Sequence, residues 1–179
     1  MPGGVDPLTH VVRTLVEMMR LRARPQDLPA SDVLLLLTLA TVALASLIAV
    51  VQLFPLPRGA ARVGCDLLVQ LGLVRLALQL SGRGARFRQT FTAICGTGSL
   101  FVLAALPLYI VLGSEPGDTL ATLSTLALLF IYVWSIIVTG HILRHAFDAT
   151  MALGIGLAVA LVVITIAVGA TVVPAPEAG

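Results

Sequence analysis

The sequence contains no lysine, only two cysteines and few charged residues of either sign. All eleven basic residues are arginines, and charged residues make up only 11% of the chain. Because soluble domains carry about 25% charged residues, this composition excludes an ordinary water-soluble fold. The hydrophobic fraction of 58% leads to the same conclusion. The chain is therefore predicted to lie in a lipid bilayer, and its arginine and alanine usage is typical of a GC-rich bacterial genome.

The common sequence signatures of enzymes are also missing. The chain has no glycine-rich phosphate-binding loop, no His-Glu-x-x-His helix and no Gly-x-Ser-x-Gly elbow. We therefore predict a protein that is not an enzyme, with no cofactor and no nucleic-acid partner.

Five long apolar runs fill most of the chain. A hydrocarbon core about 30 Å thick needs roughly 20 apolar residues for each crossing helix. The runs that meet this length are residues 33–54, 63–80, 91–112, 120–140 and 151–173. Short Pro-rich and Gly-rich turns join them, so neighbouring helices must run antiparallel and no separate domain fits between them. The sequence predicts an all-α fold, a polytopic membrane bundle of five transmembrane helices in residues 31–173.

The connecting segments predict the orientation, because arginines beside membrane spans are retained in the cytoplasm. With the N-terminus inside, eight arginines face the cytoplasm and two, Arg58 and Arg62, face outward. The eight are Arg13, Arg20, Arg22, Arg24, Arg83, Arg86, Arg88 and Arg144. We expect a multi-pass protein of the inner membrane with an extracytoplasmic tail at residues 174–179. The first span is expected to be an uncleaved anchor, because four arginines and no apolar core precede it.

Residues 1–30 form a cytoplasmic segment with its own predicted helix. Asp6 and Pro7 are favourable as the N-cap and first residue of a helix. Apolar residues then recur at helical spacing, at Leu8, Val11, Val12, Leu15, Met18 and Met19. This amphipathic helix is too short and too charged to span, so it is expected to lie in the membrane interface with Arg20, Arg22 and Arg24 near anionic headgroups. The alternative is that the same face docks on a protein partner.

Polar residues inside the second span are candidates for a transport pathway. These are Asp66, Gln70 and Arg75. Counted from the start of the run at residue 63, Asp66 lies about 4 to 5 Å inside the span, and Arg62 one turn earlier can pair with it. Arg75 can extend its guanidinium to the headgroups at the inner end. The structural interpretation of these residues is thus an interfacial carboxylate and a snorkelling arginine.

The densest polar stretch is residues 140–148. His141, His145 and Asp148 are predicted to share one helical stripe, with Arg144 at its edge. Two histidines four residues apart can bind one zinc ion, with Asp148 as a further ligand. However, positions 141 and 148 are about 10 Å apart along a helix, and Arg144 disfavours a cation. The preferred interpretation is an interfacial polar patch that binds no metal.

The two cysteines are predicted to be free. Cys65 lies near the outer end of the second span and Cys95 near the inner end of the third. Their separation exceeds the roughly 7 Å between the Cα atoms of bridged cysteines.

Several segments resemble a known family. They are residues 21–25, residues 87–90 leading into a span with Gly96 and Pro107, and residues 140–145. Together with five spans and a basic cytoplasmic N-terminus, they resemble the bacterial branch of the Yip family of Rab-interacting membrane proteins over roughly residues 10–170. The Asp-Leu-Tyr-Gly-Pro motif of eukaryotic members has no counterpart here. The resemblance therefore implies the five-helix fold and a scaffold-like role, without Rab binding.

Two functional hypotheses follow. The first is a non-enzymatic inner-membrane scaffold or accessory protein whose eight cytoplasmic arginines contact lipid headgroups or a protein partner. The second is a small transporter or channel subunit that uses Asp66, Gln70 and Arg75. A scaffold tolerates Asp66→Asn and Arg75→Gln, whereas a transporter does not. Partner, substrate and oligomeric state are left open by the sequence.

Overall fold

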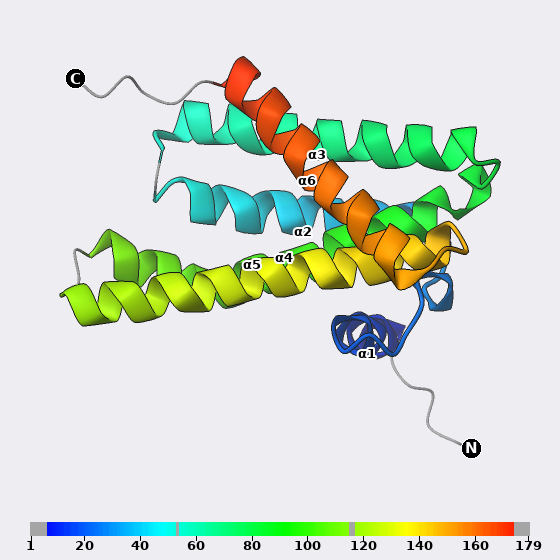
Figure 1. Ribbon diagram of the computed structural model, residues 1–179, viewed down its shortest axis with the longest axis horizontal. Coiled ribbons are helices and arrows are strands. Elements are labelled where there is room, and N and C mark those ends of the chain that lie inside the picture. Colours follow the sequence, from blue (N-terminus) through cyan, green and yellow to red (C-terminus); the bar gives the residue numbers. More distant parts are fainter. Residues whose placement is uncertain (1–6, 53, 115–116, 174–179) are drawn as a thin grey trace.

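The computed structural model describes residues 7–52, 54–114 and 117–173, and the regular secondary structure of this part of the chain is entirely helical, as predicted (Figure 1). The helices are α1 (Pro7–Met19), α2 (Asp32–Val50), α3 (Leu56–Leu80), α4 (Phe87–Gly113), α5 (Asp118–Ala146) and α6 (Met151–Val172), with short 3₁₀ helices η1 (Pro25–Asp27) and η2 (Gly84–Arg86). The expected N-cap at Asp6 and the expected tail at 174–179 lie outside the described residues.

Five of these helices, α2 to α6, are long and apolar enough to cross a membrane. The protein is therefore a multi-pass membrane protein whose apolar helices contact lipid. In the hydrocarbon region every backbone N–H and C=O must be paired within the protein, which an α-helix achieves by itself. The five predicted spans are thus confirmed in number and order.

The helices differ from the predicted spans by four or more residues at four ends. The second span, α3, begins at Leu56 rather than at residue 63, because Pro57 fits the first turn of a helix and the backbone continues through the expected turn. The first span, α2, ends at Val50 rather than at residue 54, and the third, α4, begins at Phe87 rather than at residue 91. The fourth span, α5, continues from residue 140 to Ala146, so His141, Arg144 and His145 belong to it. Hydropathy marks the apolar part of a helix and not its polar ends.

Local capping determines several helix ends. The Ser31 hydroxyl accepts a hydrogen bond from the Leu34 amide (3.3 Å), and the Thr150 hydroxyl accepts one from the Leu153 amide (3.3 Å), as N-caps do. After the end of α5, the Ala149 amide donates a hydrogen bond to the Arg144 carbonyl oxygen (2.8 Å). Asp148, the residue before Ala149, has a positive φ of +49°. This is a Schellman ending, in which an aspartate takes the left-handed position that glycine usually fills.

Helix α4 is the centre of the bundle. It packs most extensively against α2 and α5, and α1 and η1 also contact it. Every residue from Thr90 to Thr97 is buried, so this stretch is enclosed on all sides. The largest fully buried side chains of the described residues, Phe91, Met18, Leu28, Leu78 and Ile142, lie near the end of the bundle where α1 sits. We call this the α1 end and the opposite one the far end.

Helices α5 and α6 approach each other through glycine. A Cβ atom added at Gly154 would collide with the carbonyl oxygen of Gly140 and would lie 2.9 Å from the Arg144 Cβ. One at Gly140 would lie 2.9 Å from the Ile155 Cα. Close backbone approach of this kind is typical of membrane helix pairs.

The buried small-residue face of α6 differs from the stripe that spacing favours. Regular spacing favours Ala152, Gly156 and Ala160 as the packing face, yet all three are exposed. The buried small residues are Gly154, Ala158, Thr165 and Gly169. Spacing alone cannot distinguish these stripes, because α6 is apolar on every side.

The close contact between α5 and α6 predicts how two glycine substitutions in α6 change stability. We expect Gly154→Ala to lower the free energy of unfolding by about 1–3 kcal/mol, because the added methyl group overpacks the α5–α6 contact. The control is Gly156→Ala, where a Cβ atom meets nothing within 4 Å. It should be neutral or stabilising by up to about 1 kcal/mol through helix propensity. Unfolding in detergent followed by circular dichroism measures both, and equal effects would contradict the packing assignment.

Candidate functional site

Helix α1 is fixed to the bundle rather than free at the surface. Leu15 and Met18 are buried, at 6% and 0% exposure, and Leu15 lies over Gly96 of α4, where a Cβ atom would be only 2.7 Å from the Leu15 Cδ2. The Trp134 indole Nε1 of α5 donates a hydrogen bond to the Met19 carbonyl oxygen (3.1 Å). In Figure 1, α1 is seen nearly end-on while α3 and α5 run along the long axis. Helix α1 therefore lies across the bundle.

The turn after α1 is held by side chains that sequence reasoning missed. The Gln89 side-chain amide donates to the carbonyl oxygens of Leu28 (2.7 Å) and Gln26 (3.3 Å). The Gln26 amide in turn donates to the His145 carbonyl oxygen (3.0 Å). These contacts join residues about 60 or more positions apart in sequence, so no local pattern indicates them.

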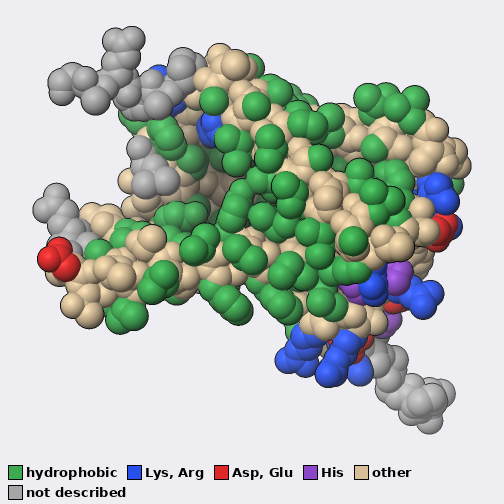
Figure 2. Space-filling model, viewed as in Figure 1, with side chains coloured by type: hydrophobic (Ala, Val, Ile, Leu, Met, Phe, Trp, Pro, Cys, Tyr) green, Lys and Arg blue, Asp and Glu red, His purple; other side chains and the backbone are tan. Residues whose placement is uncertain are grey.

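The predicted basic residues divide into two groups. Arg13, Arg20, Arg22 and Arg24 are all exposed on α1 and the turn after it, and Arg13 pairs with Glu17 of its own helix (3.0 Å). Figure 2 shows most of the basic side chains of that view gathered at the α1 end. We call Arg20, Arg22 and Arg24 the arginine turn. Beside it, Leu8 and Val12 of α1 remain 60% and 53% exposed.

The remaining predicted arginines are engaged within the protein. Arg88 of α4 pairs with Asp32 at the start of α2 (3.1 Å), while both side chains stay largely exposed. Arg144 lies at the close contact with α6, and its Nε is buried without a hydrogen-bond partner among the described residues.

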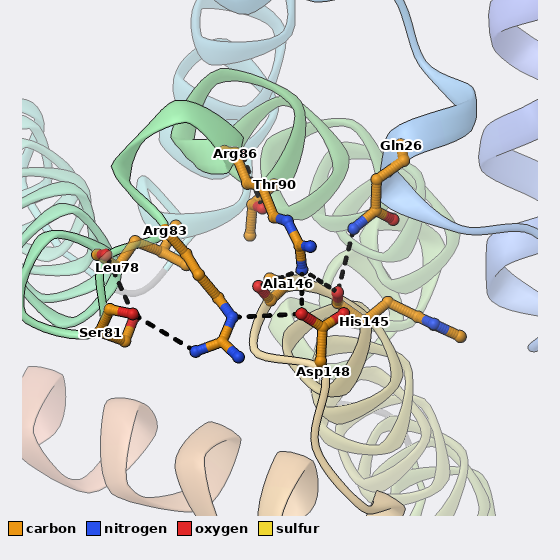
Figure 3. Close-up of polar contacts among 9 residues, drawn as sticks. All are labelled: Gln26, Leu78, Ser81, Arg83, Arg86, Thr90, His145, Ala146 and Asp148. Atoms are coloured by element: carbon orange, nitrogen blue, oxygen red, sulfur yellow. Dashed lines mark hydrogen bonds and ion pairs between the residues drawn. The ribbon is translucent and has the colours of Figure 1, made fainter.

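Arg83 and Arg86 form a clamp with the end of α5 (Figure 3). The Arg86 Nη1 donates to the carbonyl oxygens of His145 (3.2 Å) and Ala146 (3.0 Å) and to Asp148 Oδ2 (2.8 Å). The Arg83 Nε reaches the same carboxylate oxygen (3.2 Å). The last carbonyls of a helix have no partner within it and carry partial negative charge, so an arginine there both caps the helix and complements its dipole.

The clamp also determines the charge state of Asp148. The hydrogen bond from Arg86, reinforced by Arg83, holds the pKa of the Asp148 carboxyl below its ordinary value. The carboxylate is therefore ionised at neutral pH, where it pairs with both arginines.

The prediction that His141, His145 and Asp148 share a helical stripe is wrong. Helix α5 ends at Ala146, and Asp148 turns toward Arg83 and Arg86 instead. His141 is 2% exposed and its Nε2 donates to the Ala23 carbonyl oxygen (2.9 Å), which ties α5 to the turn after α1. The His145 ring packs edge-on against the His141 ring, with 4.7 Å between the ring centroids. Within the described residues no group of three His, Cys, Asp or Glu side chains is placed to hold a metal ion.

The polar residues predicted for the second span all belong to α3 but lie in different surroundings. Asp66 and Gln70 line one cavity between α2, α3, α4, α5 and α6, whereas Arg75 lies over the Phe87 ring (5.6 Å) near the α1 end. The three side chains do not line one cavity. Gly59 lies against Val50, the last residue of α2, and Asp66 lies seven residues further along α3, about 10 Å from Gly59 along the helix axis.

The two cysteines are free, as predicted. The pairing of Arg62 with Asp66 is confirmed, with 3.2 Å between Nε and Oδ2. Searches against family models, curated proteins and solved structures find no match to this chain.

The docking of α1 predicts a fluorescence change. Trp134 is the only tryptophan and contacts α1 directly. We expect Leu15→Asn to shift its emission to longer wavelength and to lower the free energy of unfolding by about 2–4 kcal/mol, because a buried leucine is replaced by an amide without a partner. Val12→Asn, on the exposed face, should leave the emission unchanged. Identical spectra for wild type and Leu15→Asn would contradict the docking.

The clamp predicts an acid-sensitive component of stability. Because the folded pKa of Asp148 lies below the unfolded value, the contribution is fully present above about pH 4 and is lost as the pH falls through the folded pKa. The thermal midpoint of wild type should therefore fall more steeply below about pH 4 than that of Asp148→Asn, which keeps the side-chain shape. Arg86→Gln should flatten the profile in the same way, and parallel profiles for all three proteins would contradict it.

Proposed function

We propose that this protein is a non-enzymatic scaffold of the inner membrane, of the Yip-like type, that gathers anionic lipid headgroups at its α1 end. In this proposal the N-terminus is cytoplasmic and α1 lies in the plane of the cytoplasmic leaflet. The observation that carries the proposal is the placement of α1 across the bundle with the arginine turn exposed beside it.

The depth of α1 supports this placement. Gly96 is nine residues from the start of α4, and Trp134 is twelve residues from the end of α5, so α1 meets both helices about 13 to 18 Å from their ends. The last turns of α5 carry the polar residues His141, Arg144 and His145. In this proposal the end of α5 therefore lies on the aqueous side of the membrane interface. A helix at that level places exposed Leu8 and Val12 against acyl chains, as interfacial helices do, while the arginine turn can reach the headgroups.

Charge supports anionic lipid as the binding partner. An arginine near an anionic surface contributes about 1 kcal/mol. Asp27 lies close to the arginine turn, and its Oδ2 accepts from the Arg24 backbone amide (2.7 Å). Glu17, the other nearby carboxylate, pairs with Arg13 (3.0 Å). The surface of this turn is therefore net positive and is held rigidly by η1, Gln89 and His141.

The test uses Trp134 as a local probe. Brominated lipids quench a nearby tryptophan, so vesicles containing either brominated phosphatidylglycerol or brominated phosphatidylcholine report which lipid accumulates beside α1. We expect wild type to prefer the anionic lipid about fivefold or more, corresponding to about 1 kcal/mol. The triple variant Arg20→Gln, Arg22→Gln, Arg24→Gln should show no preference, and 1 M salt should abolish it in wild type because the screening length falls to about 3 Å.

The control is Arg58→Gln, which removes a positive charge at the far end of the bundle and should leave the preference unchanged. Equal quenching by the two lipids in wild type would contradict the proposal. So would a preference that survives in the triple variant.

A further inference from the structure

A cavity that the lipid-binding role does not use lies between α2, α3, α4, α5 and α6, from the middle of the bundle toward its far end. Its volume is about 450 Å³, within the range of about 300–1,000 Å³ of small-molecule sites. A second space of about 280 Å³ shares Asp66, Phe101, Tyr109 and Tyr132 with it and extends to Val50 at the end of α2. Figure 2 shows the surface hollowed between the arm of α2 and α3 and the arm of α4 and α5. Asp66 therefore lies where two cavities meet.

Among the described residues, Asp66 is the only charged one that lines the larger cavity. Its Oδ2 accepts from the Arg62 Nε (3.2 Å), but its Oδ1 is buried and has no hydrogen-bond partner among the described residues. A buried carboxylate oxygen without a donor is costly, and more so in a membrane. The site therefore lacks one hydrogen-bond donor.

Two hydroxyl groups on the cavity wall donate their hydrogen bonds elsewhere. The Thr97 hydroxyl donates to the Ala93 carbonyl oxygen (2.8 Å), and the Ser135 hydroxyl donates to the Tyr132 carbonyl oxygen (2.7 Å). Both residues line the cavity, where they present only acceptor lone pairs. The unpartnered Asp66 Oδ1, together with these two acceptors, favours a ligand that donates hydrogen bonds and carries positive charge.

Arg62 is held away from the deep part of the cavity. Its guanidinium lies over Gly169 of α6, where a Cβ atom would be 2.5 Å from the Arg62 Cζ. Arg62 lines the smaller space but not the larger one. Glycine at this position gives Arg62 room on the Oδ2 side and leaves Oδ1 available to a ligand.

Much of the remaining wall is aromatic and aliphatic. Phe101, Tyr109 and Tyr132 line both spaces. Aromatic faces attract organic cations, and the aliphatic residues suit an apolar substituent. We propose that this cavity is a binding site for an organic ammonium ion with an apolar group, whose N–H donates to Asp66 Oδ1.

The test measures binding of benzylamine, which is protonated near pH 7, and of benzyl alcohol, which has nearly the same shape and no charge. Calorimetric titrations use the full-length protein in nanodiscs of zwitterionic lipid. We expect benzylamine to bind wild type about tenfold or more tightly than benzyl alcohol, because a hydrogen bond between charged groups is formed only by the amine. Asp66→Asn should abolish this preference.

Two further variants distinguish a loss of the Asp66 contact from a general loss of folded protein. Asp118→Asn removes a carboxylate at the start of α5, away from the cavity, and should bind benzylamine as wild type does. Val102→Phe keeps Asp66 and fills space in both cavities, so it should weaken benzylamine and benzyl alcohol alike. Equal affinities of wild type for the two ligands, unchanged benzylamine binding in Val102→Phe, or no saturable binding would each overturn the proposal.

Discussion

The contact of Arg86 with the end of α5 is the interaction on which the α1 end depends. One guanidinium nitrogen joins two terminal carbonyls of α5 to Asp148 and so connects the turn between α3 and α4 with the turn between α5 and α6. Terminal carbonyls of a helix need partners, and at a membrane boundary water cannot be relied on to supply them. The starts of α4 and α6 are thereby held beside the end of α5, and α1 and η1 pack on that assembly.

The two ends of the bundle differ in packing. At the α1 end, Met18, Leu28, Phe91 and Ile142 are almost completely buried, and α4 is enclosed on all sides. The far end has cavities between its helices, bordered by Asp66 and by hydroxyl-bearing side chains. A rigid end and an open end within one bundle suit two separate roles. The packed end can present a surface, and the open end can accept a ligand without disturbing it.

Much of the fold was predictable because hydropathy reports directly on the solvent of each segment. The five spans, the amphipathic helix before them and the Arg62–Asp66 pair all depend on residues close in sequence. The site was less predictable. Asp148 was placed on a helical stripe because the end of α5 is set by a Schellman turn that contains no glycine, and its partners Arg83 and Arg86 are about 60 residues away.

The sequence by itself determined the all-helical architecture and the number of membrane spans, since a chain with 58% hydrophobic residues in long runs has no other way to satisfy its backbone in lipid. Only the tertiary structure decided which faces meet. In α6 every side is apolar, so the choice of Gly154 over Gly156 for close packing came from the shape of α5. The same holds for the docking of Leu15 on Gly96 and for the separation of Asp66 from Arg75, because shape complementarity between distant segments leaves no periodic trace in the sequence.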